Sequence, residues 1–366
     1  MGFNVAAGQT APQNHPANNF DFLRLIGAVL VVYGHSYPLT GTGGPGFAAN
    51  APGTIGVKIF FVISGYLVAL SWLRDPHLPR FLLRRSLRIF PALAVVVLLS
   101  VVVLGPVITT LPLSAYFQNG WTAFYLRNIA LYINYGLPGV FETNVYPLAV
   151  NGSLWSLPVE FSMYLLTPLL LSRLVNFNRF NLAALAIGLA GVSVLLIRTW
   201  PRTSIYVLYA TNVWNWLEVA PYFLFGAAFA HYRLEWLTNI YVAFVGLFAL
   251  GVFAMSATAE EAMLVVVLPY AVLSFGLGYT AVFEQLTGKN DLSYGVFLFG
   301  FPVQQTITAV AGPQIGPWAN CLISLIVCSC LAYLSWNLVE RPMLSWKPLR
   351  HKAAPESEPV TVSVPG

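Results

Sequence analysis

Long apolar stretches recur along the chain, and short polar segments between them carry most of the charge. Ten stretches have about the length that an α-helix needs to cross the hydrocarbon layer of a membrane. They lie at residues 19–38, 54–73, 89–111, 153–172, 181–197, 215–232, 237–256, 263–283, 293–311 and 318–338. The segment 114–135 is aromatic and interrupted, which favours an interfacial or re-entrant helix. The pattern predicts an all-α polytopic membrane protein with about ten transmembrane helices.

Composition agrees with a membrane protein. The 366 residues are 57% hydrophobic and only 8% charged, whereas a soluble domain is typically about 25% charged. The net charge of +5 does not indicate nucleic-acid binding, because basic residues of membrane proteins gather in cytoplasmic loops. The cysteines Cys321, Cys328 and Cys330 share one apolar segment without metal-ligand spacing. We expect no metal site and no permanently bound cofactor.

The basic residues predict the orientation and the domain limits. Placing both termini in the cytoplasm puts thirteen Lys and Arg in cytoplasmic segments and three outside. Residues 1–18 are polar, lack Lys and Arg, and predict a flexible tail without a cleavable signal peptide. We expect a transmembrane domain over 19–345 and a disordered tail over 346–366.

The first apolar stretch carries two ionisable side chains that a helix would place on one face. Arg24 and His35 are eleven residues apart, which is about three helical turns or roughly 16 Å. Charged groups inside a membrane-length helix mark functional sites by default. The ordinary structural alternative is that Arg24 reaches the lipid headgroups and His35 is an interfacial polar residue.

Further ionisable residues fall near the predicted outer membrane face. The orientation places Lys58, Glu160 and Glu218 at a depth similar to that of His35. A carboxylate beside a histidine orients it as a general base, and we expect Glu160 to be that partner. The alternatives are an ion pair between Glu160 and Lys58, and an interfacial position for Glu218.

A basic cluster precedes the third stretch on the predicted inner side. Arg84, Arg85 and Arg88 lie close together before Pro91, and guanidinium groups suit phosphate. They predict a site for a cytoplasmic anionic ligand. Alternatively, they only anchor the chain at the inner face.

These segments together resemble the membrane-bound acyltransferase-3 family of bacterial O-acyltransferases over nearly the whole chain. Arg24 and His35 are similar to its Arg-x10-His signature, and FFVISGYLV at residues 60–68 to its second motif. The basic cluster, SLWSLPVEFSMYLLTP at 153–168, SYGVFLFGFPVQQ at 293–305 and the closing Glu340-Arg341-Pro342 resemble later motifs. Three positions depart from the pattern. Gly300 stands where many members have histidine, Lys58 where an acidic residue is frequent, and Pro158 within the Glu160 segment.

The resemblance implies an acyl-CoA donor, with acetyl-CoA expected, and an acceptor that is a glycan or lipid-linked saccharide. We expect His35, Glu160 and Arg24 to be catalytic and Arg84, Arg85, Arg88 and Arg24 to bind the donor. Lys58, Trp155, Tyr164, Glu218 and Tyr294 are expected to bind substrate. The implied location is a bacterial cytoplasmic membrane. We expect no additional hydrolase-like domain, which some members carry, because the sequence ends about thirty residues after its last expected span.

Several alternatives stay open at this level. Direct attack by the acceptor and an acyl-His35 intermediate are both compatible with the sequence. A polytopic transporter or flippase of a polysaccharide precursor would use the same charges as a translocation site, although no internal repeat is evident. In a structural subunit of an export system the charges would only set packing. The acceptor sugar, the acyl length and the oligomeric state have no sequence signature.

Overall fold

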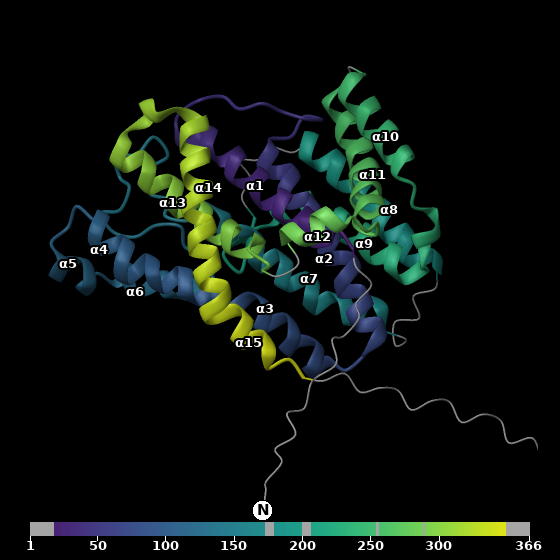
Figure 1. The fold of residues 1–366 in the computed structure, drawn as a ribbon, viewed down its shortest axis with the longest axis horizontal. Coiled ribbons are helices and arrows are strands. Elements are labelled where there is room, and N and C mark those ends of the chain that lie inside the picture. Colours follow the sequence, from purple (N-terminus) through teal and green to yellow (C-terminus); the bar gives the residue numbers. More distant parts are fainter. Residues whose placement is uncertain (1–17, 173–178, 200–205, 254–255, 288–289, 349–366) are drawn as a thin grey trace, which may run out of the picture.

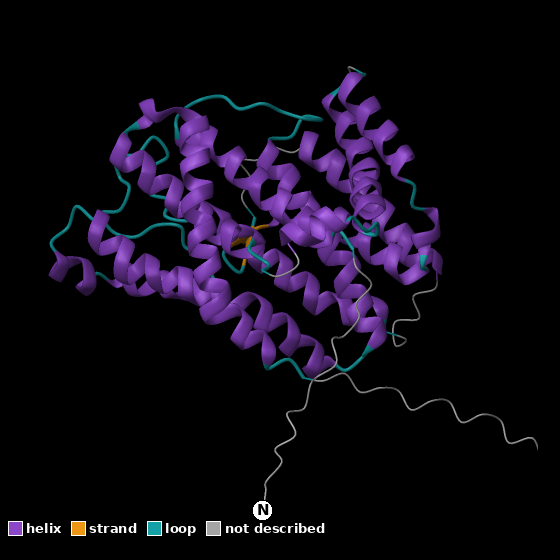
Figure 2. Cartoon of the chain, in the orientation of Figure 1, coloured by secondary structure: helices purple, strands orange, loops and turns teal. Residues whose placement is uncertain are grey.

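The computed structural model describes residues 18–172, 179–199, 206–253, 256–287 and 290–348. The expected tails at 1–18 and 346–366 lie almost entirely outside this range. The described chain is a bundle of helices, and its one sheet is a hairpin of β1 (Val207–Leu208) and β2 (Thr211–Asn212) (Figure 2). The expectation of an all-α membrane protein is therefore confirmed.

The helices follow the apolar stretches along the whole chain. Those of the first half are α1 (Phe20–Leu39), α2 (Pro52–Arg74), α3 (Leu78–Leu99), α4 (Gly105–Ile108), α5 (Leu113–Gln118), α6 (Gly120–Tyr125) and α7 (Ser156–Leu171). Those of the second half are α8 (Arg179–Thr199), α9 (Val213–Tyr232), α10 (Ile240–Val252), α11 (Ala257–Gly276), α12 (Ala281–Thr287), α13 (Ser293–Ala311), α14 (Gly316–Ser335) and α15 (Arg341–Ser345).

Short helical turns extend several of these helices. Two have π geometry, η1 (Ser100–Leu104) and η7 (Trp336–Glu340). The others are 3-10 turns: η2 (Leu126–Ala130), η3 (Gly152–Trp155), η5 (Leu234–Leu237) and η6 (Pro313–Ile315). Because the π turn η1 joins α3 to α4, the third expected stretch forms one helical rod from Leu78 to Ile108.

Each of the ten expected stretches holds a helix, but fewer meet the requirements for a membrane span. Six helical segments of the described chain are long and apolar enough to cross a membrane. They are Phe20–Leu39, Pro52–Arg74, Leu78–Ile108, Gly152–Leu171, Ala257–Gly276 and Pro313–Ser345. The count of about ten spans and the orientation of the termini remain predictions. The segment 114–135 contains α5, α6 and η2 rather than one continuous helix.

The largest difference from an expected boundary is at the start of α3. We expected this helix to begin near residue 89, but it begins at Leu78, where Pro79 occupies the first turn and His77 accepts the backbone N–H of Arg80. Proline is favoured in a first helical turn because it needs no donor there. The basic cluster consequently lies within this helix rather than before it.

Helices α1, α2 and α9 form the centre of the bundle. Figure 1 shows α8, α10 and α11 on one side of this centre, α13 and α14 on the other, and α4–α6 farther out. The α2–α9 contact depends on small residues, since a Cβ at Gly65 would lie 2.0 Å from the Phe223 carbonyl oxygen and one at Gly226 would lie 2.3 Å from that of Val62. Such close backbone approach is typical of helix packing in membranes.

Candidate functional site

Five helices enclose a polar cavity near the start of α1. The cavity has a volume of about 80 Å³ and takes its walls from α1, α2, α3, α7 and α13. Its polar lining consists of Arg24, Ser64, Arg85, Arg88, Ser156, Glu160, Tyr164, Ser293 and Tyr294. We call it the arginine cavity. It joins residues from distant parts of the sequence, including six of the predicted site residues.

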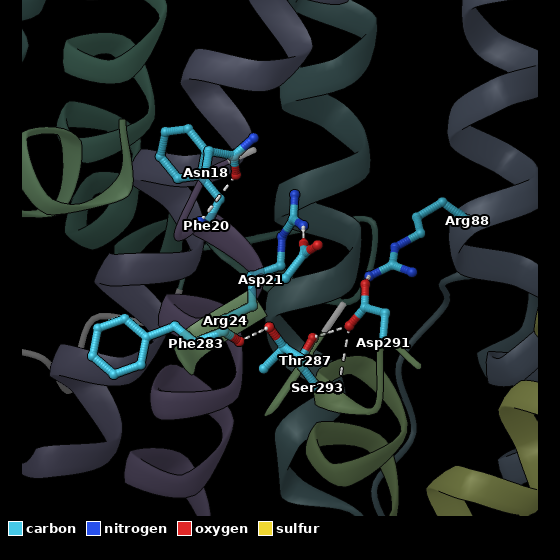
Figure 3. A network of polar contacts seen from close by, with 9 residues as sticks. All are labelled: Asn18, Phe20, Asp21, Arg24, Arg88, Phe283, Thr287, Asp291 and Ser293. Carbon is cyan, nitrogen blue, oxygen red and sulfur yellow. Dashed lines mark hydrogen bonds and ion pairs between the residues drawn. The ribbon is translucent and has the colours of Figure 1, made fainter. Parts of the chain in front are cut away.

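Two of its arginines are held by carboxylates. Arg24 donates to Asp21 Oδ1 at 2.5 Å, and Arg88 donates to Asp291 Oδ2 at 2.5 Å across to the segment before α13. Figure 3 shows both pairs in one polar network. Burial by itself would raise the pKa of Asp291, but Arg88, Arg24 and a hydrogen bond from Ser293 lower it to about 2. Asp291 therefore stays ionised and keeps Arg88 in place.

Arg85 differs from its neighbours because it has no carboxylate partner among the described residues. Its guanidinium stacks over the Tyr164 ring at 5.8 Å, and its Nε is buried without a hydrogen bond. A cation in a cavity without a paired anion is available for an anionic ligand. Of the predicted donor-binding arginines, Arg85 is thus the one that no carboxylate of the described chain holds.

Arg84 lies on a different face of α3 from Arg85. It is buried and donates to Asp75 Oδ2 at 2.8 Å, while Arg80 holds Asp75 Oδ1 at 2.6 Å. Hydrogen bonds from Arg80 and then Arg84 keep the pKa of the Asp75 carboxyl well below its usual range. Successive residues on a helix are about 100° apart, and this rotation turns Arg84 away from the arginine cavity. The structure therefore places Arg84 in a structural network, outside the cavity that was predicted for it.

Glu160 lies in the arginine cavity rather than beside His35. Its Oε1 accepts hydrogen bonds from Ser64 Oγ at 2.7 Å and from Tyr164 OH at 2.5 Å. Tyr164 is one turn later on α7, and Ser64 faces α7 from α2, so these two hydroxyls fix the carboxylate on that side. The expected Glu160–His35 hydrogen bond is not formed. Pro158, in the first turn of α7, leaves the helix intact.

His35 lines a second cavity at the other end of α1. This cavity measures about 270 Å³, and its walls include Tyr37, Trp155, residues 44–45 and residues 51–54. The imidazole meets the Phe301 ring edge-on at 5.2 Å and makes no hydrogen bond to another described residue. We call this space the histidine cavity. Its imidazole is open to a substrate hydroxyl.

A single side chain, Val57, belongs to the walls of both cavities. Trp155 lines the histidine cavity, and Ser156 next to it lines the arginine cavity. The two spaces therefore meet between α2 and the start of α7. Arg24 and His35 mark their two ends, as their same-face spacing on α1 predicts.

Lys58 belongs to neither cavity. Its Nζ is buried and donates to Glu261 Oε1 at 2.7 Å and to Asn50 Oδ1 at 2.8 Å, while Asn50 Nδ2 donates to Glu261 Oε2 at 2.7 Å. Tyr222 adds a longer bond of 3.3 Å to Glu261. Glu261 lies near the start of α11. Glu218 lies one turn before Tyr222 on α9 and lines neither cavity.

The substitution of histidine by glycine at position 300 also has a packing reason. A Cβ at Gly300 would lie 2.9 Å from Val32 Cγ2, and Val32 is fully buried. A histidine would therefore need Val32 to move. This part of α13 packs directly on α1 instead of presenting a polar side chain.

Sequence reasoning missed the partners that hold the ionisable residues. Ser64 orients Glu160, Asp291 holds Arg88, and Glu261 neutralises Lys58. A signal was available, because the chain has only 13 acidic residues and buried charges in membranes pair with one another. The pairing itself depends on how the helices rotate against each other.

Comparisons with known proteins identify the family of the chain. A family model described as an acyltransferase domain, Acyl_transf_3, matches residues 18–337. The chain is 31% identical to the O-acetyl transferase of Shigella phage Sf6, over 90% of this chain and 97% of that protein. It is 30% identical to Nodulation protein 10 of Rhizobium leguminosarum bv. viciae, over 89% of this chain and 93% of that protein.

A third relative matches over a smaller region. The peptidoglycan O-acetyltransferase OatA of Listeria monocytogenes is 31% identical over 52% of this chain and 29% of its own length. No protein of known structure matches the chain. The family model and the two full-length relatives show that the chain is a membrane acyltransferase of the acyltransferase-3 family.

Proposed function

We propose that the chain moves an acyl group, acetyl in the simplest case, from cytoplasmic acyl-CoA to a sugar hydroxyl of a cell-surface or exported glycan. The names of two relatives, an O-acetyl transferase and a peptidoglycan O-acetyltransferase, support transfer to oxygen and a glycan acceptor. The location would be a bacterial cytoplasmic membrane.

One observation carries the proposal. Two cavities follow each other along α1, the first with three arginines and the second with His35, and they share the wall residue Val57. A donor with phosphates at one end and a thioester at the other is a long molecule that matches this order. Its reactive end would have to travel roughly 16 Å from Arg24 to His35.

The arginine cavity would hold the donor. Arg85 offers free guanidinium donors to a phosphate, and Arg24 and Arg88 add positive charge from fixed positions. Charge-assisted hydrogen bonds to phosphate are the strongest polar contacts available to such a site. The cavity is too small for a whole CoA, so the nucleotide would remain at the cytoplasmic mouth while the pantetheine arm enters.

Glu160 would position this arm. Its Oε1 is occupied by Ser64 and Tyr164, whereas its Oε2 has no hydrogen-bond partner among the described residues. We assign Oε2 as acceptor for an amide N–H of the pantetheine.

His35 would carry out the proton transfers. Its unprotonated nitrogen takes the proton of the acceptor hydroxyl, and the oxygen attacks the thioester carbonyl carbon. The C–S bond then breaks, and the CoA thiolate receives the proton from the imidazolium. Removal of a positioned general base typically lowers the rate about 10²–10⁴-fold.

The test is acyl transfer from radiolabelled acetyl-CoA to glycan in inverted membrane vesicles. Wild type is compared with His35→Ala at equal protein levels, and His77→Ala is the matched control, because His77 is exposed in the turn before α3. We expect label in glycan with wild type and His77→Ala, and at least a hundredfold less with His35→Ala.

Other outcomes would change the proposal. Equal label with His35→Ala would keep the acyltransferase and reject the role of His35. Label trapped on His35 itself would replace direct transfer by an acyl-histidine intermediate. No transfer from acetyl-CoA with any variant would refute the proposed donor or acceptor.

A further inference from the structure

An apolar groove adjoins the histidine cavity on the side facing α10. It has a volume of about 610 Å³, and its wall is almost free of polar atoms. Its walls come from α1, the 45–52 segment, α2, α10 and α11, and they include Leu30, Tyr33, Phe47, Phe244, Leu247 and Phe248. Phe244 and Phe248 are 61% and 70% exposed, so the groove opens sideways. In a membrane this opening would face lipid.

The groove borders the histidine cavity. Pro45 and Pro52 line both spaces. At their border the hydroxyl groups of Tyr33 and Tyr37 are 2.6 Å apart, with Tyr33 on the groove side and Tyr37 on the cavity side. The lining thus changes from apolar to polar over one turn of α1. This profile matches a molecule with an aliphatic chain and a polar head.

The segment that separates the two spaces is held firmly. Phe47 and Asn50 pair in a tight turn whose middle residues, Ala48 and Ala49, have φ angles of 48° and 56°. Alanine adopts this left-handed conformation only at an energetic cost. The turn is retained because the side chain of Asn50 is fixed between Lys58 and Glu261. The 45–52 segment is therefore fixed in place by these hydrogen bonds.

We propose that the groove binds the aliphatic chain of a lipid-linked saccharide acceptor and delivers its sugar to His35. Bulk lipid would fill any apolar groove in a membrane, but a chain attached to the acceptor would also place its polar head at the border with the histidine cavity, where Pro45 and Pro52 line both spaces. This inference rests on the proposed function, because it requires acyl transfer to take place in the histidine cavity.

The test uses a photoreactive glycolipid, glucosyl geranylgeranyl phosphate with a diazirine on the chain, and protein reconstituted in phosphatidylcholine vesicles. Leu247→Trp fills the groove, whereas Val245→Trp adds the same bulk on a part of α10 that is 68% exposed and outside the groove. We expect crosslinks within residues 244–248 of wild type. Leu247→Trp should reduce them about tenfold, the order of effect of a blocked apolar contact, and Val245→Trp should not.

Activity measurements separate this inference from the proposed function. With acetyl-CoA as donor, Leu247→Trp should raise the KM for the glycolipid about tenfold and leave kcat/KM for the free sugar unchanged. Crosslinking that is unaffected by Leu247→Trp, or abolished by excess plain phospholipid, would overturn the groove assignment. Groove crosslinks without any acyl transfer would instead refute the proposed function and retain the glycolipid site.

Discussion

Replacing Arg85 by alanine should weaken donor binding with little effect on folding. Arg85 has no carboxylate partner in the described chain, so its removal leaves no buried anion unpaired. The stability lost is limited to its contact with the Tyr164 ring, on the order of 0.5–1 kcal/mol. The lost hydrogen bonds to a phosphate are worth about 1.5–3 kcal/mol. The KM for acetyl-CoA should therefore rise about 10- to 150-fold.

The neighbouring Arg84 is the matched control. Arg84→Ala removes a guanidinium that holds Asp75 and lines neither cavity. It should lower thermal stability and expression while the KM for acetyl-CoA stays unchanged. Arg85→Lys should recover part of the binding, because it keeps the charge but loses the forked donors.

Steady-state transfer in inverted vesicles, with acetyl-CoA and with acetylpantetheine, provides the assay. Acetylpantetheine lacks all phosphates, so the difference between wild type and Arg85→Ala should disappear with this donor. An unchanged KM for acetyl-CoA in Arg85→Ala would refute the assignment of Arg85 to phosphate binding. The same increase with both donors would show that Arg85 acts on the cavity rather than on a phosphate.

Three further predictions concern the passage and the buried charges. Val57→Trp should block the junction of the two cavities and reduce kcat at least tenfold without weakening acetyl-CoA binding. An unchanged kcat would show that the reaction does not use a passage past Val57. Lys58→Met should lower the free energy of unfolding by about 3–5 kcal/mol, because it leaves the buried Glu261 carboxylate without its cation, and adding Glu261→Leu should restore much of this loss. Thermal unfolding in detergent measures both changes. A double variant that is no more stable than Lys58→Met would argue against the buried charge as the cause. Asp75→Asn should lower the unfolding temperature at pH 7. Because the pKa of Asp75 is depressed in the folded protein, its carboxylate contributes fully to stability above the usual pKa of 3.8, and this contribution is lost as the pH falls below that value. The difference in unfolding temperature between wild type and Asp75→Asn should therefore shrink in acid. A difference that grows in acid would contradict this reasoning.

Much of the fold can be predicted from local sequence. Each of the ten apolar stretches contains a helix, because a backbone in lipid must satisfy its own hydrogen bonds and a run of apolar side chains leaves few other structures. The helix boundaries are harder to predict. The start of α3 was misplaced because Arg80, Arg84 and Arg88 look like a polar loop, whereas their helix is stabilised by the Asp75 and Asp291 carboxylates from other segments.

The candidate site divides in the same way. The common face of Arg24 and His35 and their separation along α1 follow from the sequence alone, because the rise and rotation per residue of a helix are constant. The membrane class follows from composition, and the spacing of Arg85 and Arg88 places both on one face of α3. The neighbours of Glu160, Lys58 and Arg84 do not follow from the sequence, because each is chosen by how one helix rotates and crosses against another. That choice depends on Gly65 and Gly226 between α2 and α9 and on the fit of the whole bundle, and only the tertiary structure decides it.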